Sequence, residues 1–162
     1  MAEFQWFALA VNPEPWAIGD LSVGRKNGKM FPMVGRNNQL HMYKEAIKEE
    51  LGDPGVWIDG KIELAFFFWR RRDDYKTPQA RTHRKHEADL TNLQKATEDA
   101  LQGILFKNDK DVAKITSFMI AQGAEVNSKV VIGIREFTGF IEIPNEVLVK
   151  IGELEEVESN EW

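Results

Sequence analysis

The chain lacks cysteine altogether, and it has no long apolar run. The absence of cysteine among its 162 residues excludes disulfide bonds and thiolate metal sites, and it agrees with a reducing compartment. The longest apolar run, residues 64–69, is far too short to span a bilayer. The first residues lack the basic, apolar and small-residue succession of a secretory signal, so we expect no signal peptide. These absences predict a cytoplasmic protein without membrane contact.

The negative charge of the chain is concentrated at its C-terminal end. The net charge is −5, and residues 151–162 contain five glutamates and no lysine or arginine, so residues 1–150 are neutral overall. With 43% hydrophobic and 29% charged residues, the composition is typical of a globular protein that closes one core. We therefore expect a single domain over residues 1–150, followed by an acidic, solvated tail over residues 151–162.

Positive charge gathers in residues 70–86. This stretch contains seven lysines and arginines and two histidines against two aspartates. Such local polarity favours contact with DNA phosphates in spite of the acidic net charge. The alternative is that the basic stretch is only a solvated face, which is common for an isolated loop. The candidate DNA-contact residues are Arg70, Arg71, Arg72, Lys76, Arg81, Arg84 and Lys85.

Hydrophobic periodicity predicts six elements in the order β-α-β-α-β-β. They are a strand at 4–11, a helix at 38–51, a strand at 61–69, a helix at 90–102 and strands at 112–120 and 129–137. The stretch 14–36, rich in Pro, Gly and Asn, is expected to form turns. The aromatic residues Phe66 to Phe68 are expected in the core. The pattern predicts an α/β (α+β) domain with a mixed sheet and two main helices.

The residues that open the second predicted helix combine an acid and a base. Asp89 stands where an N-cap is expected, and capping alone would explain an aspartate there. Residues three and four apart share a helix face, so Asn92, Lys95 and Asp99 line one polar strip. A surface pair between Lys95 and Asp99 is the alternative explanation for the lysine. Because a helix N-terminus attracts anions, the same end offers a carboxylate for a metal ion and a cation for phosphate.

A second polar group follows at Asn108, Asp109 and Asp111. Asn-Asp pairs favour turns, so a plain turn is the alternative explanation. A single carboxylate rarely holds Mg²⁺, which prefers several hard oxygen ligands. The metal-site hypothesis therefore requires that folding brings this turn beside Asp89, within reach of a common divalent ion.

The stretch from Asp89 to Val112 resembles the core motif of the RusA family of Holliday junction resolvases. The family pattern is Asp-x-Asp-Asn-Leu-x-Lys-Ala, then Asp-Ala-Leu, then Asp-Asp and a strand that begins with Val. A looser likeness in element order extends over residues 4–137. The resemblance implies a homodimeric endonuclease, encoded mainly by phages and prophages, that cuts four-way DNA junctions symmetrically with Mg²⁺ as cofactor.

The resemblance also implies roles for single residues. Asp89 and Asp109 match aspartates that bind the metal, and Lys95 matches the catalytic lysine. Asn92 matches the motif asparagine and is expected to support the site. The expected reaction is phosphodiester hydrolysis in which Mg²⁺, or Mn²⁺, polarises the phosphate while Lys95 neutralises developing charge.

Two positions depart from the family pattern. Thr91 stands where a metal-binding aspartate is expected, and Asn108 replaces the first aspartate of the later pair. The Thr91 hydroxyl can coordinate Mg²⁺ but brings no negative charge, so metal affinity should fall unless Glu87 or Asp111 substitutes. Glu98 is expected to be too far along the helix, on the order of 10 Å away, to replace it directly.

Two other classes of function remain open from the sequence. The first is a protein that binds branched DNA without cutting it, because Thr91 has weakened the metal site. The second is an interaction protein of a phage replication complex that uses its acidic tail for docking. Cleavage of a synthetic four-way junction would separate the nuclease from both.

Overall fold

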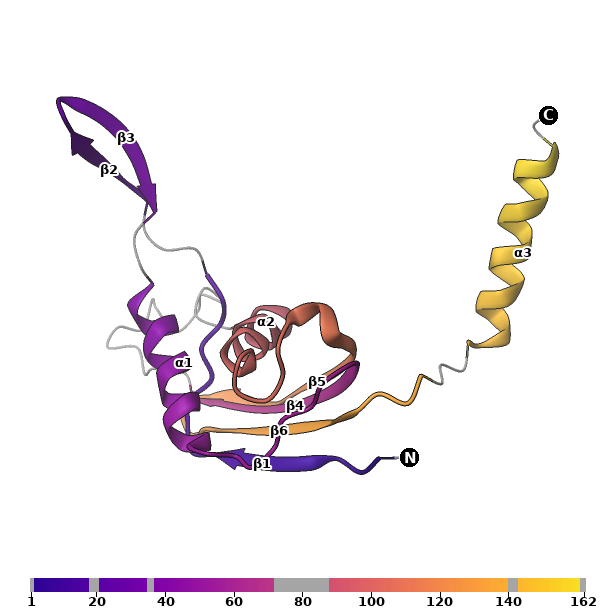
Figure 1. Cartoon of the computed structure of the whole chain (residues 1–162), viewed down its shortest axis with the longest axis horizontal. Coiled ribbons are helices and arrows are strands. Elements are labelled where there is room, and N and C mark those ends of the chain that lie inside the picture. The colour runs from indigo at the N-terminus through magenta and orange to yellow at the C-terminus, as the bar shows by residue number, and fades with distance from the viewer. Residues whose placement is uncertain (1, 18–20, 35–36, 72–87, 140–142, 161–162) are drawn as a thin grey trace.

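The main body of the protein is one four-stranded sheet with two helices on one face. The computed structural model describes residues 2–17, 21–34, 37–71, 88–139 and 143–160. The strands of the sheet are β1 (Gln5–Leu9), β4 (Ile62–Arg71), β5 (Val112–Gly123) and β6 (Lys129–Glu136). The helices are α1 (Asn38–Leu51) and α2 (Leu90–Leu101). Both helices lie on the same side of the sheet (Figure 1).

The sheet is mixed, as the sequence predicts. Its strand order is β1-β6-β4-β5, so β4 is central and β5 forms one edge. β5 runs parallel to β4 because α2 makes the crossover between them, whereas β6 pairs with β1 and β4 in antiparallel fashion. The predicted α+β class, with a mixed sheet and two packed helices, is therefore confirmed.

The core lies between the helices and the sheet. In α1, Leu40, Tyr43, Ile47 and Leu51 recur at helical spacing and are all buried, which confirms the helix predicted at 38–51. The Tyr43 hydroxyl is 2.7 Å from the hydroxyl of Thr97 on α2, so one buried polar pair joins the two helices. Burial raises the pKa of Tyr43 well above its ordinary value.

The opposite face of the sheet carries a row of aromatic side chains. Phe66 is fully buried under the helices, but Phe67 points to this open face, so the expectation that it is a core residue is wrong. Its ring centroid is 5.9 Å from that of Trp6 and 5.2 Å from that of Phe118. Trp6 lies over Gly133, where a Cβ atom would be 2.6 Å from the indole, so only glycine leaves room for this ring.

A buried carboxylate lies within the same open face. Glu63 on β4 is 3.0 Å from Lys114 on β5, and it accepts a hydrogen bond of 2.7 Å from Arg135 on β6. Burial raises the pKa of Glu63, but the two cations outweigh burial and the net effect lowers it. This pairing satisfies a charge that would otherwise destabilise the sheet.

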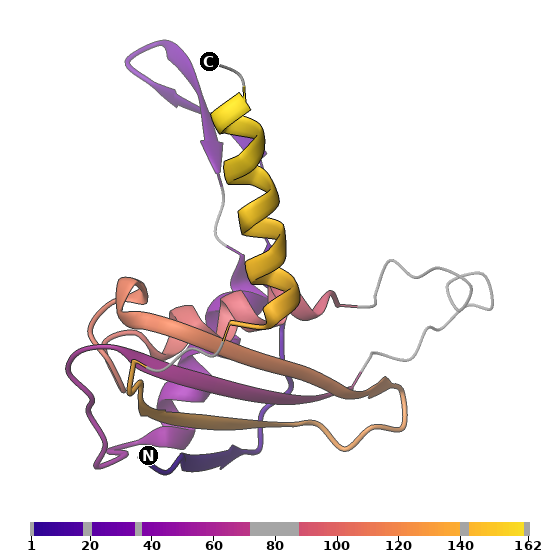
Figure 2. The ribbon, with the colours of Figure 1, turned by 90° about the vertical axis from the view of Figure 1, so that its right-hand side faces the viewer.

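Residues 14–36 do not consist only of turns, and that prediction is wrong. They contain a separate two-stranded sheet formed by β2 (Leu21–Lys26) and β3 (Lys29–Val34). The strands meet at Asn27-Gly28, whose φ angles of 51° and 76° match the two-residue turn that Asn-Gly favours in hairpins. The β2–β3 hairpin projects away from the main body (Figures 1 and 2).

The C-terminal part of the chain contains a further helix, α3 (Asn145–Asn160). It crosses the boundary between residues 150 and 151 that the charge pattern suggested for the tail. It also stands away from the sheet (Figure 1). A one-turn 3-10 helix, η3 (Asp109–Asp111), precedes β5. Among the described residues, no helix has the length and apolar character needed to cross a membrane.

Candidate active site

The carboxylate of Asp89 is exposed at the N-terminal end of α2. The backbone carbonyl of Asp89 accepts hydrogen bonds of 3.1 Å from the amides of Asn92 and Leu93, as at any helix start. Its side chain, however, makes no capping hydrogen bond. Asp89 therefore stands at the predicted N-cap position but without the side-chain bond that a capping role would use. Among the described residues, the carboxylate of Asp89 is thus left for a ligand at the positive end of the helix dipole.

Gln122 fixes the position of this helix end against the sheet. Its side-chain oxygen accepts hydrogen bonds from the amide of Ala88, at 2.8 Å, and from the guanidinium of Arg70, at 3.0 Å. Arg70 also donates to the carbonyl of Pro13, at 3.0 Å, and its side chain is only 12% exposed. These contacts make Arg70 part of the scaffold next to Asp89, which argues against the direct DNA contact predicted for it.

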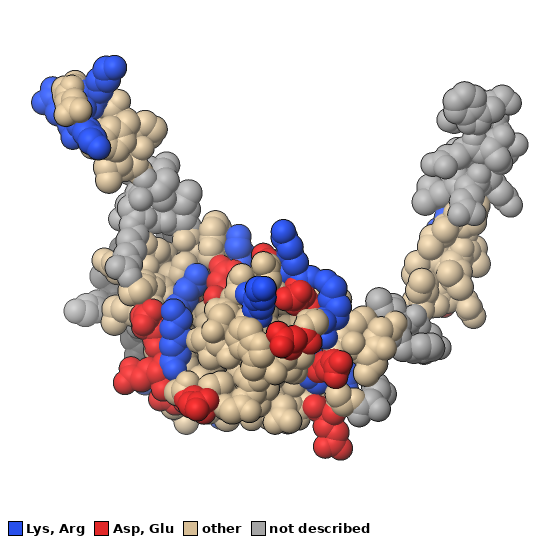
Figure 3. Space-filling model, in the orientation of Figure 1, with Lys and Arg blue, Asp and Glu red and all other residues tan. Residues whose placement is uncertain are grey.

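Of the other predicted DNA-contact residues, only Arg71 lies in the described part of the chain. Arg71 is exposed at the end of β4, where its backbone amide donates to the Asn12 side chain at 2.8 Å. The candidates outside the described residues are Arg72, Lys76, Arg81, Arg84 and Lys85, together with the possible substitute acid Glu87. On the side of the molecule seen in Figure 3, cations and acids are interspersed over the main body.

Lys95 lies against an aromatic ring rather than against an acid. Its ammonium is 3.8 Å from the ring centroid of Trp16, and the backbone amide of Trp16 donates to the carbonyl of Asn92 at 2.9 Å. Asp99 instead pairs with Lys44 on α1 at 3.5 Å. The alternative of a surface pair between Lys95 and Asp99 is therefore wrong. The cation–π contact orients the ammonium of Lys95, an exposed residue in the first half of α2.

The later polar group forms the turn that its composition favours. The Asn108 side chain accepts a hydrogen bond of 3.1 Å from the amide of Lys110 and so caps η3. The prediction of a turn is confirmed. The capping bond also explains why an asparagine stands at position 108. Asp109 is exposed and Asp111 is half-buried. Thr91, at the other end of α2, is also exposed.

Within one chain the structure does not bring Asp89 and Asp109 together. α2 runs antiparallel to β5: Ala88 bonds to Gln122 near the end of β5, whereas Asp109 lies just before its first residue (Figure 2). Between these ends, Gln94 accepts a hydrogen bond of 2.7 Å from Ser117. The 12 residues of α2 have a length of about 18 Å, which separates the two acids. The expectation of a common ion within one chain is therefore wrong.

Asp109 has Glu98 as its acidic neighbour. Glu98 is half-buried, and burial, followed by the charges of Asp99 and Asp109, raises its pKa. The C-terminal half of α2 and η3 thus form an acidic group, which we call the distal acidic group: Glu98, Asp99 and Asp109. Spacing could not reveal it, because it depends on how the chain after α2 turns back toward the sheet.

The donor set of a single chain does not make a complete metal cage. No three histidine or acidic side chains in the described ranges are arranged to hold an ion. The available donors are separate exposed carboxylates, which suit a hydrated Mg²⁺ whose remaining ligands are waters and substrate phosphate. The described residues of one chain therefore fit a divalent ion only with further ligands from outside this set.

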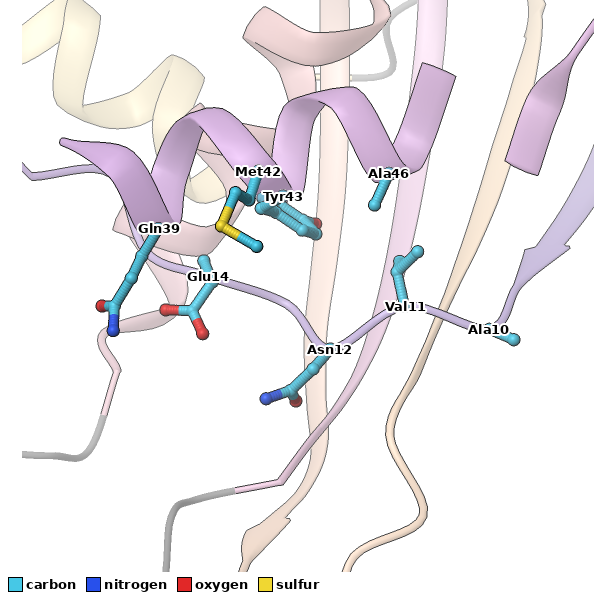
Figure 4. A pocket seen from close by; sticks show the side chains of 8 residues that line it. All are labelled: Ala10, Val11, Asn12, Glu14, Gln39, Met42, Tyr43 and Ala46. Carbon is cyan, nitrogen blue, oxygen red and sulfur yellow. The ribbon is translucent and has the colours of Figure 1, made fainter. Parts of the chain in front are cut away.

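A pocket of about 310 Å³ lies elsewhere, between α1 and the segment that follows β1 (Figure 4). Tyr43 and Met42 form its wall on α1, and Val11, Asn12 and Glu14 line the opposite wall. None of the predicted site residues belongs to its lining. The pocket is therefore separate from the candidate site.

The exposed acid and the lysine on α2 of this mixed α+β domain are groups that could bind a metal ion and a phosphate. Comparison with protein families gives the more particular result. The family model described as Endodeoxyribonuclease RusA matches residues 21–135, so the chain belongs to the RusA family of endodeoxyribonucleases. A search of curated proteins finds no match to the chain. The family match includes the β2–β3 hairpin and both ends of α2, but it does not include Trp16 or α3.

Proposed function

We propose that the protein is a Mg²⁺-dependent endonuclease that cuts four-way DNA junctions as a homodimer. Membership of an endodeoxyribonuclease family supports cleavage of DNA. The observation that carries the proposal is the exposed carboxylate of Asp89, which makes no capping bond at the start of α2, together with Lys95 on the following turns of the same helix. The proposed setting is the cytoplasm of a bacterial or phage-infected cell, where branched DNA arises.

The separation of Asp89 from Asp109 supports a site built from two subunits. β5 is an edge strand of 12 residues, and long unpaired edges readily pair with another chain. If two β5 edges pair in antiparallel fashion about a twofold axis, opposite strand ends become neighbours. Asp89 of one chain would then face Asp109 of the partner subunit. Two equivalent sites would result, as symmetric cleavage of a junction requires.

The N-terminal end of α2 would bind and orient the scissile phosphate. Its uncapped amides and the helix dipole favour an anion there, and the ammonium of Lys95 can neutralise charge that develops during cleavage. Trp16 would hold Lys95 at this end through the contact already described. Mg²⁺, held by Asp89 and by Asp109 of the partner subunit, would supply Lewis-acid polarisation of the phosphate and a water of lowered pKa.

Thr91 would tune the affinity for the metal. Its hydroxyl is an exposed neutral oxygen near Asp89, where the family pattern has a second carboxylate. A neutral ligand attracts a divalent cation less strongly than a carboxylate does, so we expect a requirement for millimolar Mg²⁺ or replacement by Mn²⁺. Asn92 and Asn108 would support the two halves of the site through the backbone contacts that they make.

Thr91 also favours a second candidate function. If the loss of one carboxylate prevents metal binding altogether, the protein would hold four-way junctions without cutting them. The absence of a three-acid cluster among the residues that the structure describes agrees with this alternative.

The experiment that separates the two functions is cleavage of a synthetic four-way junction by the purified chain with Mg²⁺ or Mn²⁺. We expect symmetric nicks with the natural protein. With Asp89→Asn we expect junction binding to persist and cleavage to fall by at least about a thousandfold, since a metal-binding charge is lost. Unchanged cleavage by Asp89→Asn would refute the proposed mechanism. Tight binding without cleavage by the natural protein would select the binding function.

A further inference from the structure

The β2–β3 hairpin exposes apolar side chains to an unusual extent. Val23 is 64% exposed, Met30 71%, Phe31 41% and Met33 43%. Its two strands pair only with each other in the described part of the chain. An isolated two-stranded hairpin is marginally stable in water, so a protruding hairpin with this surface is suited to an external partner.

The charge of the hairpin indicates what that partner is. Residues 21–34 contain three cations and no acid. Lys26 and Lys29 are directly paired across the strands next to the tip, and like charges opposite each other destabilise a hairpin. In Figure 3 the tip, at the upper left, shows blue side chains and no red ones. A polyanion would relieve this repulsion, whereas a second copy of the same basic hairpin would increase it.

Cations and large apolar groups share one face of the hairpin. Cross-strand partners point to the same side, so Phe31, paired with Gly24, lies on the face of Lys26 and Lys29. A Cβ atom on Gly24 would be 2.3 Å from the sulfur of Met33 and 2.6 Å from the ring of Phe31, so both side chains fold over this glycine. The face therefore combines phosphate-binding ammonium groups with an aromatic surface on which an unpaired base can stack.

The hairpin begins close to the candidate active site. The segment that precedes it includes Trp16, which bonds to Asn92 and lies under Lys95. The segment that follows it leads to α1, whose first turn is capped by Asn37. DNA held by the hairpin would therefore extend toward the N-terminal end of α2.

We propose that the β2–β3 hairpin is a DNA-binding arm that recognises the branch of the substrate. Lys26, Lys29 and Arg25 contact backbone phosphates of one duplex arm. Phe31 and Met33 contact bases that are exposed where the strands exchange. A two-stranded ribbon is narrow enough to lie in a major groove. This inference rests on the proposed junction substrate, and it assigns to the hairpin the choice of a branched over a linear duplex.

The test compares K26Q/K29Q with the matched control K48Q/K150Q, which removes the same charge from exposed lysines outside the hairpin. Binding of the full chain to a four-way junction is measured with Ca²⁺ in place of Mg²⁺ over a range of salt concentrations. We expect K26Q/K29Q to weaken binding about ten- to a hundredfold and to reduce the salt slope by about 2, as two lost phosphate contacts require. The control should behave like the natural chain.

A second variant tests recognition of the branch. F31A/M33A should keep the salt slope but lose most of the preference for a four-way junction over a linear duplex of the same sequence. The proposal would be overturned if K26Q/K29Q kept the salt slope of the natural chain. It would also be overturned if K26Q/K29Q and its control lost the same junction affinity. A change in oligomeric state of K26Q/K29Q without DNA would also overturn it, because the hairpin would then be a contact between copies.

The same measurements distinguish this inference from the proposed function. If the natural chain neither binds nor cuts a junction, both fail. If it binds and cuts while the hairpin variants do the same, only the arm is wrong.

Discussion

The two ends of α2 differ in the ligand that each can attract. The N-terminal end has the exposed carboxylate of Asp89, which makes no capping bond, and Lys95 follows it on the same helix. The C-terminal end lies in the distal acidic group, where the pKa of Glu98 is raised by burial and by its acidic neighbours. The first end suits a phosphate and the second suits a cation, but metal-assisted hydrolysis needs both in one place. Under the proposed mechanism, a second subunit would supply what each end lacks.

The largest expected effect comes from mixing two inactive variants. Asp89→Asn and Asp109→Asn should each lose cleavage, but together they should regain about a quarter of the natural nicking rate. The reason is that random subunit exchange makes about half of the dimers mixed, and each mixed dimer has one intact site of two. The measurement is nicking of a labelled four-way junction after incubation of the mixture.

The control for this experiment is a mixture of Asp89→Asn with Lys95→Gln. Both changes lie at the same end of α2, so no mixed dimer has an intact site and activity should stay lost. If Asp89→Asn and Asp109→Asn exchange subunits but do not complement each other, the site lies within one chain and the contrast between the two ends has no catalytic meaning.

A smaller effect is expected at Trp16. Trp16→Leu removes the ring under Lys95 and should lower kcat about tenfold, since the cation–π contact that orients the ammonium is lost. Junction affinity should change little, Tm should fall because Trp16 also packs against the core, and Trp16→Phe should recover part of the rate. In a double-mutant cycle, adding Trp16→Leu to Lys95→Gln should lower kcat no further. Additive losses would show that Trp16 acts independently of the lysine.

The smallest effect is expected in the distal acidic group. Because its folded pKa is raised, Glu98 binds a proton more tightly in the folded than in the unfolded state, so its ionised form opposes folding at neutral pH. Glu98→Gln should therefore increase the free energy of unfolding at pH 7.5 by less than about 1 kcal/mol. This gain should disappear as the pH falls through the folded pKa of Glu98. Urea unfolding at several pH values measures it.

Glu45→Gln is a suitable control for this variant, because Glu45 is exposed and, within the described part of the chain, pairs with the neighbouring Lys48. A destabilising effect of Glu98→Gln at neutral pH would contradict the acidic character assigned to this end of α2.

Sequence patterns predicted the elements that form the core. The helical spacing of Leu40, Tyr43, Ile47 and Leu51 depends on burial against one surface, and such periodicity is visible in the sequence. The β2–β3 hairpin was not predicted, although Asn27-Gly28 is a strong turn signal. Its strands have apolar side chains on both faces, so the usual alternation of a half-buried strand is absent.

The sequence predicted which residues belong to the candidate site, but not the distances between them. Asp89 and Lys95 are positioned by the local start of α2, which the sequence contains. The distance from Asp89 to Asp109 depends instead on the direction in which α2 crosses the sheet, and no spacing of residues encodes that direction. The partner of Lys95 was also missed, because Trp16 comes from a segment that is remote in sequence.

Gln122 has a consequence for how this enzyme can vary. One of its oxygen atoms accepts hydrogen bonds from both Arg70 and Ala88, so the chain leaves the sheet and returns to α2 at nearly the same point. The number and sequence of the residues between Arg71 and Ala88 can therefore change with little effect on the position of Asp89. The reason is that the entropic cost of closing a connection rises only slowly with its length. Related proteins can therefore vary this stretch while Asp89 keeps its place against the end of β5.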